Sequence, residues 1–125
     1  MNIKWIQMSE KNKAILLKGN AAIARHDHEA FLSCCTDDTE WTFVGEQTLK
    51  GKEAVRQYMA TTYREPPNVT VDNLIADGDF LTAVGTITMK DSDGKMTHYA
   101  YCDVWRFRDG KMAELKAFVI KTEAL

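Results

Sequence analysis

The sequence lacks the features by which membrane proteins and nucleic-acid-binding proteins are recognised. No apolar run approaches the roughly 20 residues of a membrane-spanning helix, and the N-terminus has no apolar segment of a signal peptide. The 16 lysines and arginines are spread thinly, and no basic stripe is interleaved with aromatic side chains. We therefore expect a cytoplasmic protein that binds neither a membrane nor a nucleic acid.

Cysteine is also scarce, and its three residues do not make a disulfide framework. Cys34 and Cys35 are adjacent, so a bridge between them would be strained, and we expect buried thiols. No lysine or arginine immediately flanks this pair to lower a thiol pKa, which argues against a redox role. The chain has no C-x-x-C pair and no H-E-x-x-H helix, so we expect no metal site and no cofactor.

The chain is long enough for one hydrophobic core and too short for two domains. Its 125 residues are 45% hydrophobic and 27% charged, which is an ordinary composition for a globular protein. We therefore expect a single domain over residues 1–125. Residues 1–8 carry Trp5 and Ile6, and we expect them to form a short N-terminal arm that docks on the domain.

Helical signals dominate the first part of the chain. Ser9 is a suitable N-cap for a first helix, in which small and apolar residues recur with helical spacing as far as Arg25. Asp27 is expected to cap a second, short helix that ends at residues 36–38.

A small hairpin and a third helix follow. Residues 39–44 alternate in the manner of a strand, and a turn brings residues 47–49 back beside them. The third helix opens at residues 51–53, and the only two prolines of the sequence, at 66 and 67, stop it.

From Asn68 onward the pattern changes to the period of two that is typical of β-strands. Three Asp-Gly pairs predict hairpin turns in this part of the chain. We therefore expect an antiparallel meander of strands over residues 69–76, 80–89, 96–107 and 111–121.

One of these strands carries the residue that most needs an explanation. One face of residues 96–108 consists of Tyr99, Tyr101, Asp103, Trp105 and Phe107. A carboxylate among four aromatic rings is costly to ionise, because a buried charge must either be paired or become neutral. Asp103 is therefore the candidate catalytic residue.

Four short motifs follow one another in an order that is more informative than any of them alone. They are D-x-E-A-F at residues 27–31, T-D-D at 36–38, G-K-E-A-V at 51–55 and D-V-W-R-F-R-D-G-K at 103–111. With helices before a sheet, this order resembles the nuclear transport factor 2-like superfamily over roughly residues 9–121. That group includes the SnoaL-like polyketide cyclases, ketosteroid isomerase, scytalone dehydratase and limonene epoxide hydrolase.

The resemblance implies an α+β, cystatin-like cone, in which three N-terminal helices pack on a strongly curved, mostly antiparallel sheet around an apolar pocket. This scaffold hosts unrelated reactions as well as non-catalytic binding. Of the ketosteroid isomerase pattern, the strand aspartate matches Asp103. The general base of that enzyme would fall at Thr42 or Phe43 and its oxyanion-hole tyrosine near Gly19, and none of these three has the required side chain.

Asp103 has both functional and structural interpretations. It could act as a general acid or base, or as a neutral donor to a substrate oxygen; alternatively, it could be tied to Arg106, to a tyrosine hydroxyl or to the backbone. The aromatic residues could likewise line a pocket or fill the core. The expected ligand-binding residues are Trp41, Phe43, Tyr58, Thr86, Thr88, Tyr99, Tyr101 and Trp105.

Two functions remain open. In the first, the protein is an isomerase-, cyclase- or lyase-type enzyme that uses Asp103 on a small, apolar, carbonyl-containing molecule. In the second, it is a non-catalytic ligand-binding or structural dimer with the same fold. An open cavity of a few hundred cubic ångströms at Asp103 would favour a ligand site.

The other face of the predicted sheet also carries apolar groups, which predicts that it packs on another copy of the chain. We therefore expect a homodimer that joins sheet to sheet. Its expected interface consists of His98, Ala100, Cys102, Val104, Lys116, Phe118 and Ile120.

Overall fold

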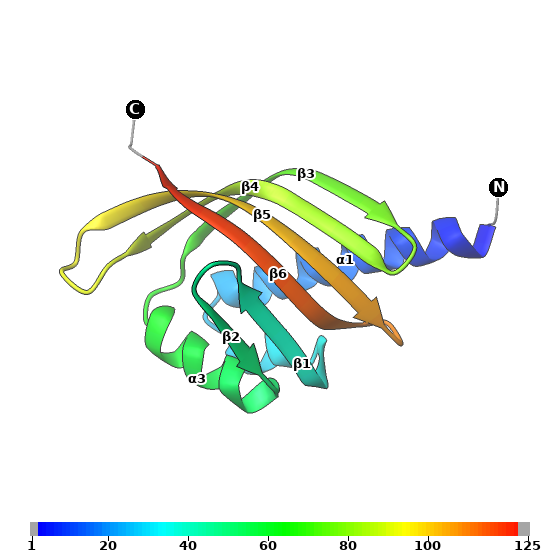
Figure 1. Ribbon diagram of the computed structural model, residues 1–125, viewed down its shortest axis with the longest axis horizontal. Helices are drawn as coiled ribbons and strands as arrows, with labels where there is room; N and C mark the ends of the chain where they lie inside the picture. Colours follow the sequence, from blue (N-terminus) through cyan, green and yellow to red (C-terminus); the bar gives the residue numbers. More distant parts are fainter. Residues whose placement is uncertain (1–2, 123–125) are drawn as a thin grey trace.

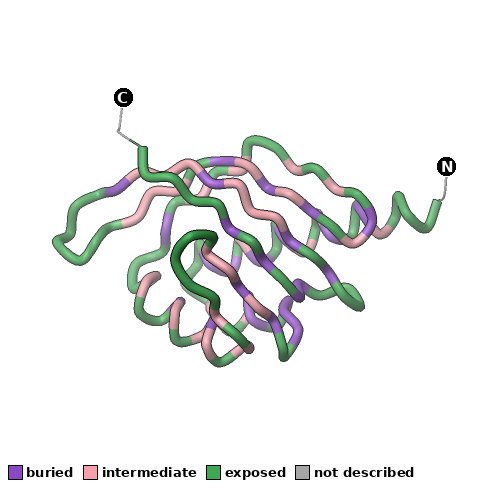
Figure 2. The backbone as a smooth tube through the Cα atoms, in the orientation of Figure 1, coloured by how far each residue is buried: buried purple, intermediate pink, exposed green. Residues whose placement is uncertain are grey.

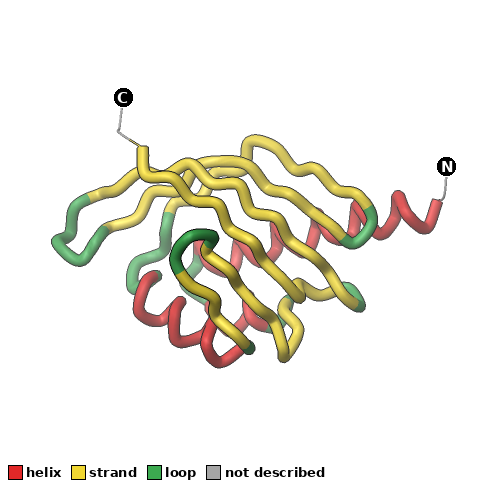
Figure 3. Tube along the Cα trace, viewed as in Figure 1, coloured by secondary structure: helices red, strands yellow, loops and turns green. Residues whose placement is uncertain are grey.

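Three helices and six strands make up residues 3–122, which are the residues that the computed structural model describes. The helices are α1 (Ile3–Ala24), α2 (His28–Leu32) and α3 (Lys52–Thr62). The strands are β1 (Cys35–Phe43), β2 (Gln47–Lys50), β3 (Asn68–Asp77), β4 (Phe80–Lys90), β5 (Met96–Arg108) and β6 (Lys111–Thr122). Figure 3 shows the helices gathered beneath the curved sheet.

The strands form one mixed sheet in the order β2-β1-β6-β5-β4-β3 (Figure 1). β1 runs parallel to β6, and every other neighbouring pair is antiparallel. The expected meander from β3 to β6 is therefore confirmed, as is the α+β class with helices before a mostly antiparallel sheet. The glycines of its three Asp-Gly turns all have positive φ angles, between 64° and 78°, which a glycine adopts without steric cost.

The sheet bends where β3 and β4 approach each other at Gly85. A Cβ atom at this position would lie 1.9 Å from the backbone oxygen of Thr70. The register of β3 shifts between Val71 and Asn73, which marks a β-bulge opposite the glycine. The Tyr101 hydroxyl donates a hydrogen bond of 2.8 Å to the same Thr70 oxygen. Glycine and bulge together let the outer strands curve over the helices.

The hydrophobic core lies between the helices and the side of the sheet that faces them (Figure 2). The helices and the central strands each contribute apolar side chains to this core from one face. Leu16 of α1, Phe31 of α2, Met59 of α3, Leu81 of β4 and Met112 of β6 are each at most 2% exposed. Burying such side chains contributes roughly 1.5–3 kcal/mol each, so this layer holds the helices on the sheet.

The expectation of an N-terminal arm is wrong for residues 3–8, because α1 begins at Ile3. Ser9 is buried inside the helix and does not cap it. The side chain of Trp5 does dock, as expected: its ring lies against Gly78, and its Nε1 donates to Asp77 Oδ1 at 3.1 Å. This contact with the β3–β4 turn stabilises the first turns of α1, which the local sequence did not predict to be helical. Residues 1 and 2 lie outside the described residues.

The second helix is shorter than expected. Asp27 caps it as predicted, since its Oδ1 accepts from the Ala30 N–H at 3.0 Å. The helix ends before the two cysteines, however, and β1 begins at Cys35 instead of residue 39. The cause is a non-local contact, because the Met112 N–H donates to the Cys34 oxygen at 2.8 Å and draws this segment beside β6. Both thiols are buried, as predicted.

Candidate ligand pocket

A cavity of about 330 Å³ lies between the helices and the concave side of the sheet. Side chains from α1, α2, α3 and strands β1, β3, β4, β5 and β6 line it, and most of them are apolar or aromatic. The volume falls within the roughly 300–1,000 Å³ of small-molecule sites. The helix-facing side of the sheet therefore encloses open space in addition to a packed core.

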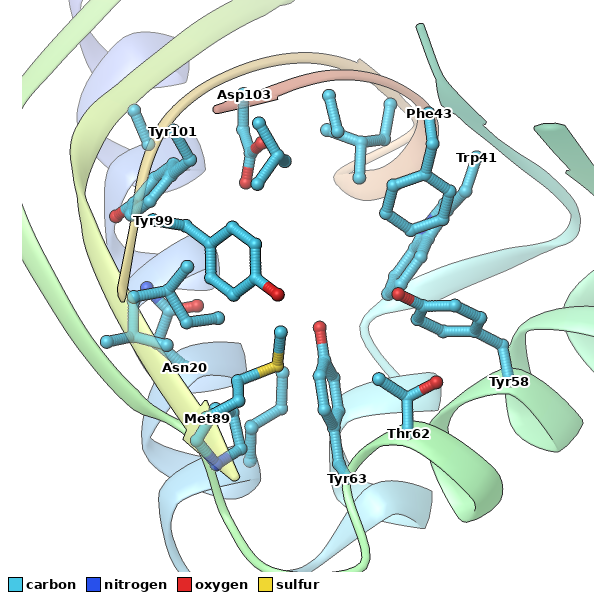
Figure 4. A pocket seen from close by; sticks show the side chains of 18 of the residues that line it. Asn20, Trp41, Phe43, Tyr58, Thr62, Tyr63, Met89, Tyr99, Tyr101 and Asp103 are labelled. Carbon is cyan, nitrogen blue, oxygen red and sulfur yellow. The ribbon is translucent and has the colours of Figure 1, made fainter. Parts of the chain in front are cut away.

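β5 supplies the polar centre of this cavity (Figure 4). Its lining residues are Tyr99, Tyr101, Asp103 and Trp105, which are four of the five residues that the alternation of the strand places on one face; the fifth, Phe107, does not line this cavity. Asp103 is paired with Ala83 of β4 and with Ala117 of β6, both of which also line the cavity. Because both neighbours carry only a methyl group, they leave room beside the carboxyl.

The opposite wall is aromatic. Trp41 and Phe43 reach it from β1 and Tyr58 from α3, as expected. The Phe43 and Tyr58 rings lie 5.0 Å apart between centroids, and the Trp41 ring lies 5.9 Å from that of Trp105 in an edge-to-face arrangement. Such packing holds each ring in place and forms a rigid apolar surface against which a flat molecule could lie.

Thr86 and Thr88 do not belong to the pocket, so this part of the sequence prediction is wrong. They are paired with Ala100 and His98 of β5, which alternate with the cavity residues of that strand. Both threonines consequently lie on the outer face of the sheet. The face of β4 that lines the cavity carries Ala83, Ile87 and Met89. Either face of β4 was compatible with the alternation, and only the register with β5 decides between them.

Asp103 has no hydrogen bond or ion pair with any residue in the described part of the chain. Burial among the rings and aliphatic side chains raises its pKa from 3.8 to about 7. Arg106 cannot compensate it, because its guanidinium is on the outer face and pairs with Asp79 at 3.5 Å and Glu114 at 3.8 Å. The carboxyl therefore exists in both protonation states near neutral pH.

Three of the tyrosines that line the cavity, Tyr58, Tyr63 and Tyr101, remain protonated at neutral pH. Burial raises the pKa of Tyr101 to about 12, with a further rise from the charge of Asp103. Burial also raises the pKa of Tyr58 and of Tyr63. These three phenols are therefore neutral, and each carries an O–H donor.

Tyr63 is one of the pocket residues that the sequence did not predict. It follows the last residue of α3, where the chain leaves the helical conformation with φ −104° and ψ 49°. Its ring is directed into the cavity from the side opposite β5 (Figure 4). Helical spacing cannot place a residue beyond the end of a helix, so the local pattern carried no signal for it. Asn20 of α1 also lines the cavity and was missed.

The other candidate sites offer less chemistry. Burial raises the pKa of Cys35 to about 12, so its thiol stays protonated. Within residues 3–122, no group of three or more His, Cys, Asp or Glu side chains is arranged to hold a metal ion. None of the helices in the same range is long and apolar enough to cross a membrane.

Helices packed on a curved mixed sheet around an internal pocket define the NTF2-like class of α+β proteins. The model of the SnoaL-like domain matches residues 18–115, and the chain belongs to this family. A search of curated proteins gives no significant match.

Several solved structures share the fold. An NTF2-like protein of unknown function from Cytophaga hutchinsonii is 25% identical, with a TM-score of 0.72 over 90% of this chain and 99% of that one. TerC, crystallised with polyporic acid, is 21% identical, with a TM-score of 0.77 over 88% and 92%. An LEH-like epoxide hydrolase from M. tuberculosis is 14% identical, with a TM-score of 0.80 over 90% and 84%.

Proposed function

We propose that the protein binds a small, largely apolar molecule with a carbonyl oxygen in this pocket, and that Asp103 acts on it as the acid–base group of an isomerase- or cyclase-type enzyme. The observation that carries the proposal is a carboxyl with a pKa near 7 that faces an open and mostly apolar cavity and has no partner among residues 3–122. A structural carboxylate would be paired or exposed, whereas this one bears an energetic cost that a ligand could relieve.

The two protonation states give Asp103 two abilities. The protonated acid donates a hydrogen bond to a carbonyl or enolate oxygen, whereas the carboxylate accepts a proton from the substrate. A group whose pKa lies near the working pH serves well as a general acid or base, and it typically contributes about 10² to 10⁴ in rate.

Proteins with similar structures support the use of the pocket without naming the reaction. TerC was crystallised with polyporic acid, and another neighbour is an epoxide hydrolase. Because this fold hosts different reactions, the reaction class for our chain rests on Asp103 and its surroundings.

A binding experiment with three versions of position 103 tests the proposal. We expect 1-tetralone, a bicyclic ketone, to bind in calorimetric titrations, with most of its affinity retained by Asp103→Asn, which keeps a donor. The affinity of Asp103→Leu for 1-tetralone should be about 3- to 10-fold lower, which corresponds to the loss of one hydrogen bond. Asp93→Leu, which changes an exposed acid in the β4–β5 turn, should bind like the unmodified protein.

The alternative is a non-catalytic ligand-binding or structural dimer module. This alternative is favoured by the absence of a base at Thr42 and Phe43, where the base of ketosteroid isomerase would fall. The Thr42 hydroxyl is hydrogen-bonded to that of Thr48 at 3.2 Å, and the side chain of Phe43 has no group that accepts a proton. Binding that is unaffected by Asp103→Leu would favour a non-catalytic binder. Absence of binding by any ring ketone would favour a structural module.

A further inference from the structure

The hydroxyl groups around the cavity fall into two sets. The Tyr101 hydroxyl already donates to the Thr70 backbone oxygen at 2.8 Å. The Tyr58 hydroxyl interacts with the side chain of Thr62, and this interaction partly offsets the rise that burial causes in the pKa of Tyr58. These two phenols contribute to the structure of the wall and have less need of a ligand.

Tyr63 and Tyr99 form the second set, because neither hydroxyl has a hydrogen-bond partner among the described residues. Figure 4 shows their oxygens directed toward the centre of the cavity from different walls, Tyr99 from β5 and Tyr63 from the chain after α3. The carboxyl of Asp103 is directed into the same space. Three polar groups from two sides of the cavity therefore face one volume.

Unpartnered donors gather in this part of the molecule. Two phenols and, in its protonated form, the carboxyl of Asp103 face the cavity without a hydrogen-bond partner among residues 3–122. An unpaired donor in an apolar environment carries a free-energy cost. A ligand with several acceptor oxygens would remove this cost, whereas a hydrocarbon would not.

We propose that Tyr63, Tyr99 and Asp103 form a hydrogen-bonding cluster that selects a flat ligand with two acceptor oxygens, in particular the enolate of a cyclic 1,3-dicarbonyl compound. The inference rests on the proposed function, because it concerns the same cavity. The aromatic rings of Trp41 and Tyr58 accommodate the flat ring. Hydrogen bonds to a charged oxygen are about twice as strong as those to a neutral one, so the cluster favours the enolate.

Two ligands that differ in one hydroxyl provide the test. 4-Hydroxycoumarin is a cyclic 1,3-dicarbonyl that is an anion at neutral pH, and coumarin is the same ring system without the enol oxygen. In calorimetric titrations at pH 6, we expect 4-hydroxycoumarin to bind at least about 10-fold more tightly than coumarin, as for one charge-assisted hydrogen bond.

Variants identify the groups responsible. Tyr63→Phe and Tyr99→Phe should each lower the affinity for 4-hydroxycoumarin by about 5- to 30-fold, with a smaller loss for coumarin. Thr88→Val removes a hydroxyl from the outer face of the sheet and is the matched control, with both affinities unchanged. Thermal melting of each variant verifies that it is folded.

A pH series on the unmodified protein provides a measurement that does not depend on any variant. The titratable side chains that line the cavity are Glu46 from the β1–β2 turn, Tyr58 from α3, Tyr63 after it, and Tyr99, Tyr101 and Asp103 from β5. Burial raises the pKa values of Tyr58, Tyr63 and Tyr101, so these phenols stay protonated from about pH 6 to 8.5, whereas the pKa of Asp103 lies within this interval. Ionisation of Asp103 should therefore lower the affinity for 4-hydroxycoumarin at least about 10-fold between these two pH values.

The outcomes separate this inference from the proposed function. Equal affinity for the two ligands, or a preference that both tyrosine variants retain, overturns the cluster while leaving the pocket as a binding site. Binding of coumarin without binding of 4-hydroxycoumarin would likewise overturn the cluster and leave the pocket as a binding site. If neither ligand binds at millimolar concentration, both the cluster and the proposed pocket function are wrong.

Discussion

At the scale of single residues, the neutral form of Asp103 is favoured because its neighbours in the sheet carry no charged or hydrogen-bonding side chain. Ala83 and Ala117 stand beside it in the sheet and offer neither a charge nor a hydrogen bond. Arg106 is on the same strand but on the opposite face, where it pairs with other acids. With no hydrogen-bond or ion-pair partner among residues 3–122, burial sets the pKa of the carboxyl near 7.

We expect Asp103→Asn to be more stable than the unmodified protein above pH 7. The unfolded chain releases the Asp103 proton near pH 3.8, whereas the folded chain holds it to about pH 7. The folded state thus binds more protons between these values, and the free energy of unfolding falls as the pH rises through this interval. The loss amounts to at most about 4 kcal/mol, since each pKa unit corresponds to roughly 1.4 kcal/mol.

Urea denaturation at pH 5 and pH 8 measures this effect. The free-energy difference between Asp103→Asn and the unmodified protein should grow in favour of the variant from pH 5 to pH 8. Asp93→Asn, which changes an exposed turn residue, is the control and should show no such growth. The same difference at both pH values for Asp103→Asn would contradict a raised pKa.

We expect no appreciable isomerisation of an unsaturated ketosteroid. A positioned base typically contributes about 10² to 10⁴ in rate, and neither Thr42 nor Phe43 can supply it. Formation of the conjugated enone, followed by its ultraviolet absorbance, measures the reaction. Turnover that Asp103→Ala abolishes would contradict this prediction, because it would mean that the alignment is misjudged or that a second base acts together with Asp103.

At the scale of elements, the curvature that closes the pocket depends on the contact between β3 and β4. Thr70, Gly85 and Tyr101 meet there, and the Tyr101 hydroxyl that holds the bulge belongs to a ring that also lines the cavity. The bend of the sheet and the shape of the pocket are thus coupled through one side chain.

Gly85→Ala should destabilise the protein by at least about 3 kcal/mol, because its Cβ would lie 1.9 Å from the Thr70 oxygen and the two strands would have to separate. Gly94→Ala is the matched control: its φ angle is 78°, but a Cβ there meets nothing within 4 Å, so only a backbone cost of about 1 kcal/mol is expected. Chemical denaturation of both variants provides the comparison. Equal losses would mean that the approach of β3 to β4 is not rigid.

At the scale of the whole molecule, the outer face of the sheet exposes several apolar side chains. Phe118 and Ile120 are 43% and 67% exposed there, and they are paired with Cys102 and Ala100 of β5. Val104 continues the same face beside them. Contiguous apolar side chains in the centre of a sheet are a common feature of protein–protein contacts.

We predict that this face joins two copies of the chain in a homodimer. Sedimentation at micromolar concentration should show a dimer for the unmodified protein and a monomer for Ile120→Glu, because the variant places a charge in the contact. Leu17→Glu, which changes an exposed leucine of α1, should remain dimeric. A monomeric unmodified protein would contradict the prediction, as would a contact that buries well below roughly 1,000 Å².

Features that depend on neighbours along the chain could be predicted from the sequence. The alternation of β5 placed Tyr99 and Asp103 on one face, and the Asp-Gly pairs located the turns of the meander. Asp27 caps its helix through an atom only three residues away. Such patterns can be recognised in the sequence because the periods of strands and helices, and the geometry of turns and caps, depend only on residues that are close together in the chain.

Which groups meet across the fold could be learned only from the three-dimensional arrangement. Register with β5 turned Thr86 and Thr88 outward, and pairing with β6 drew Cys35 into β1. The same folding placed Tyr63, which follows the end of a helix, in the wall of the cavity, and it gave Asp103 no partner within the described part of the chain. Alternation defines the two faces of a strand, but it does not determine which face is buried. The partners of a residue also come from segments that are distant in the sequence. These outcomes therefore depend on long-range packing.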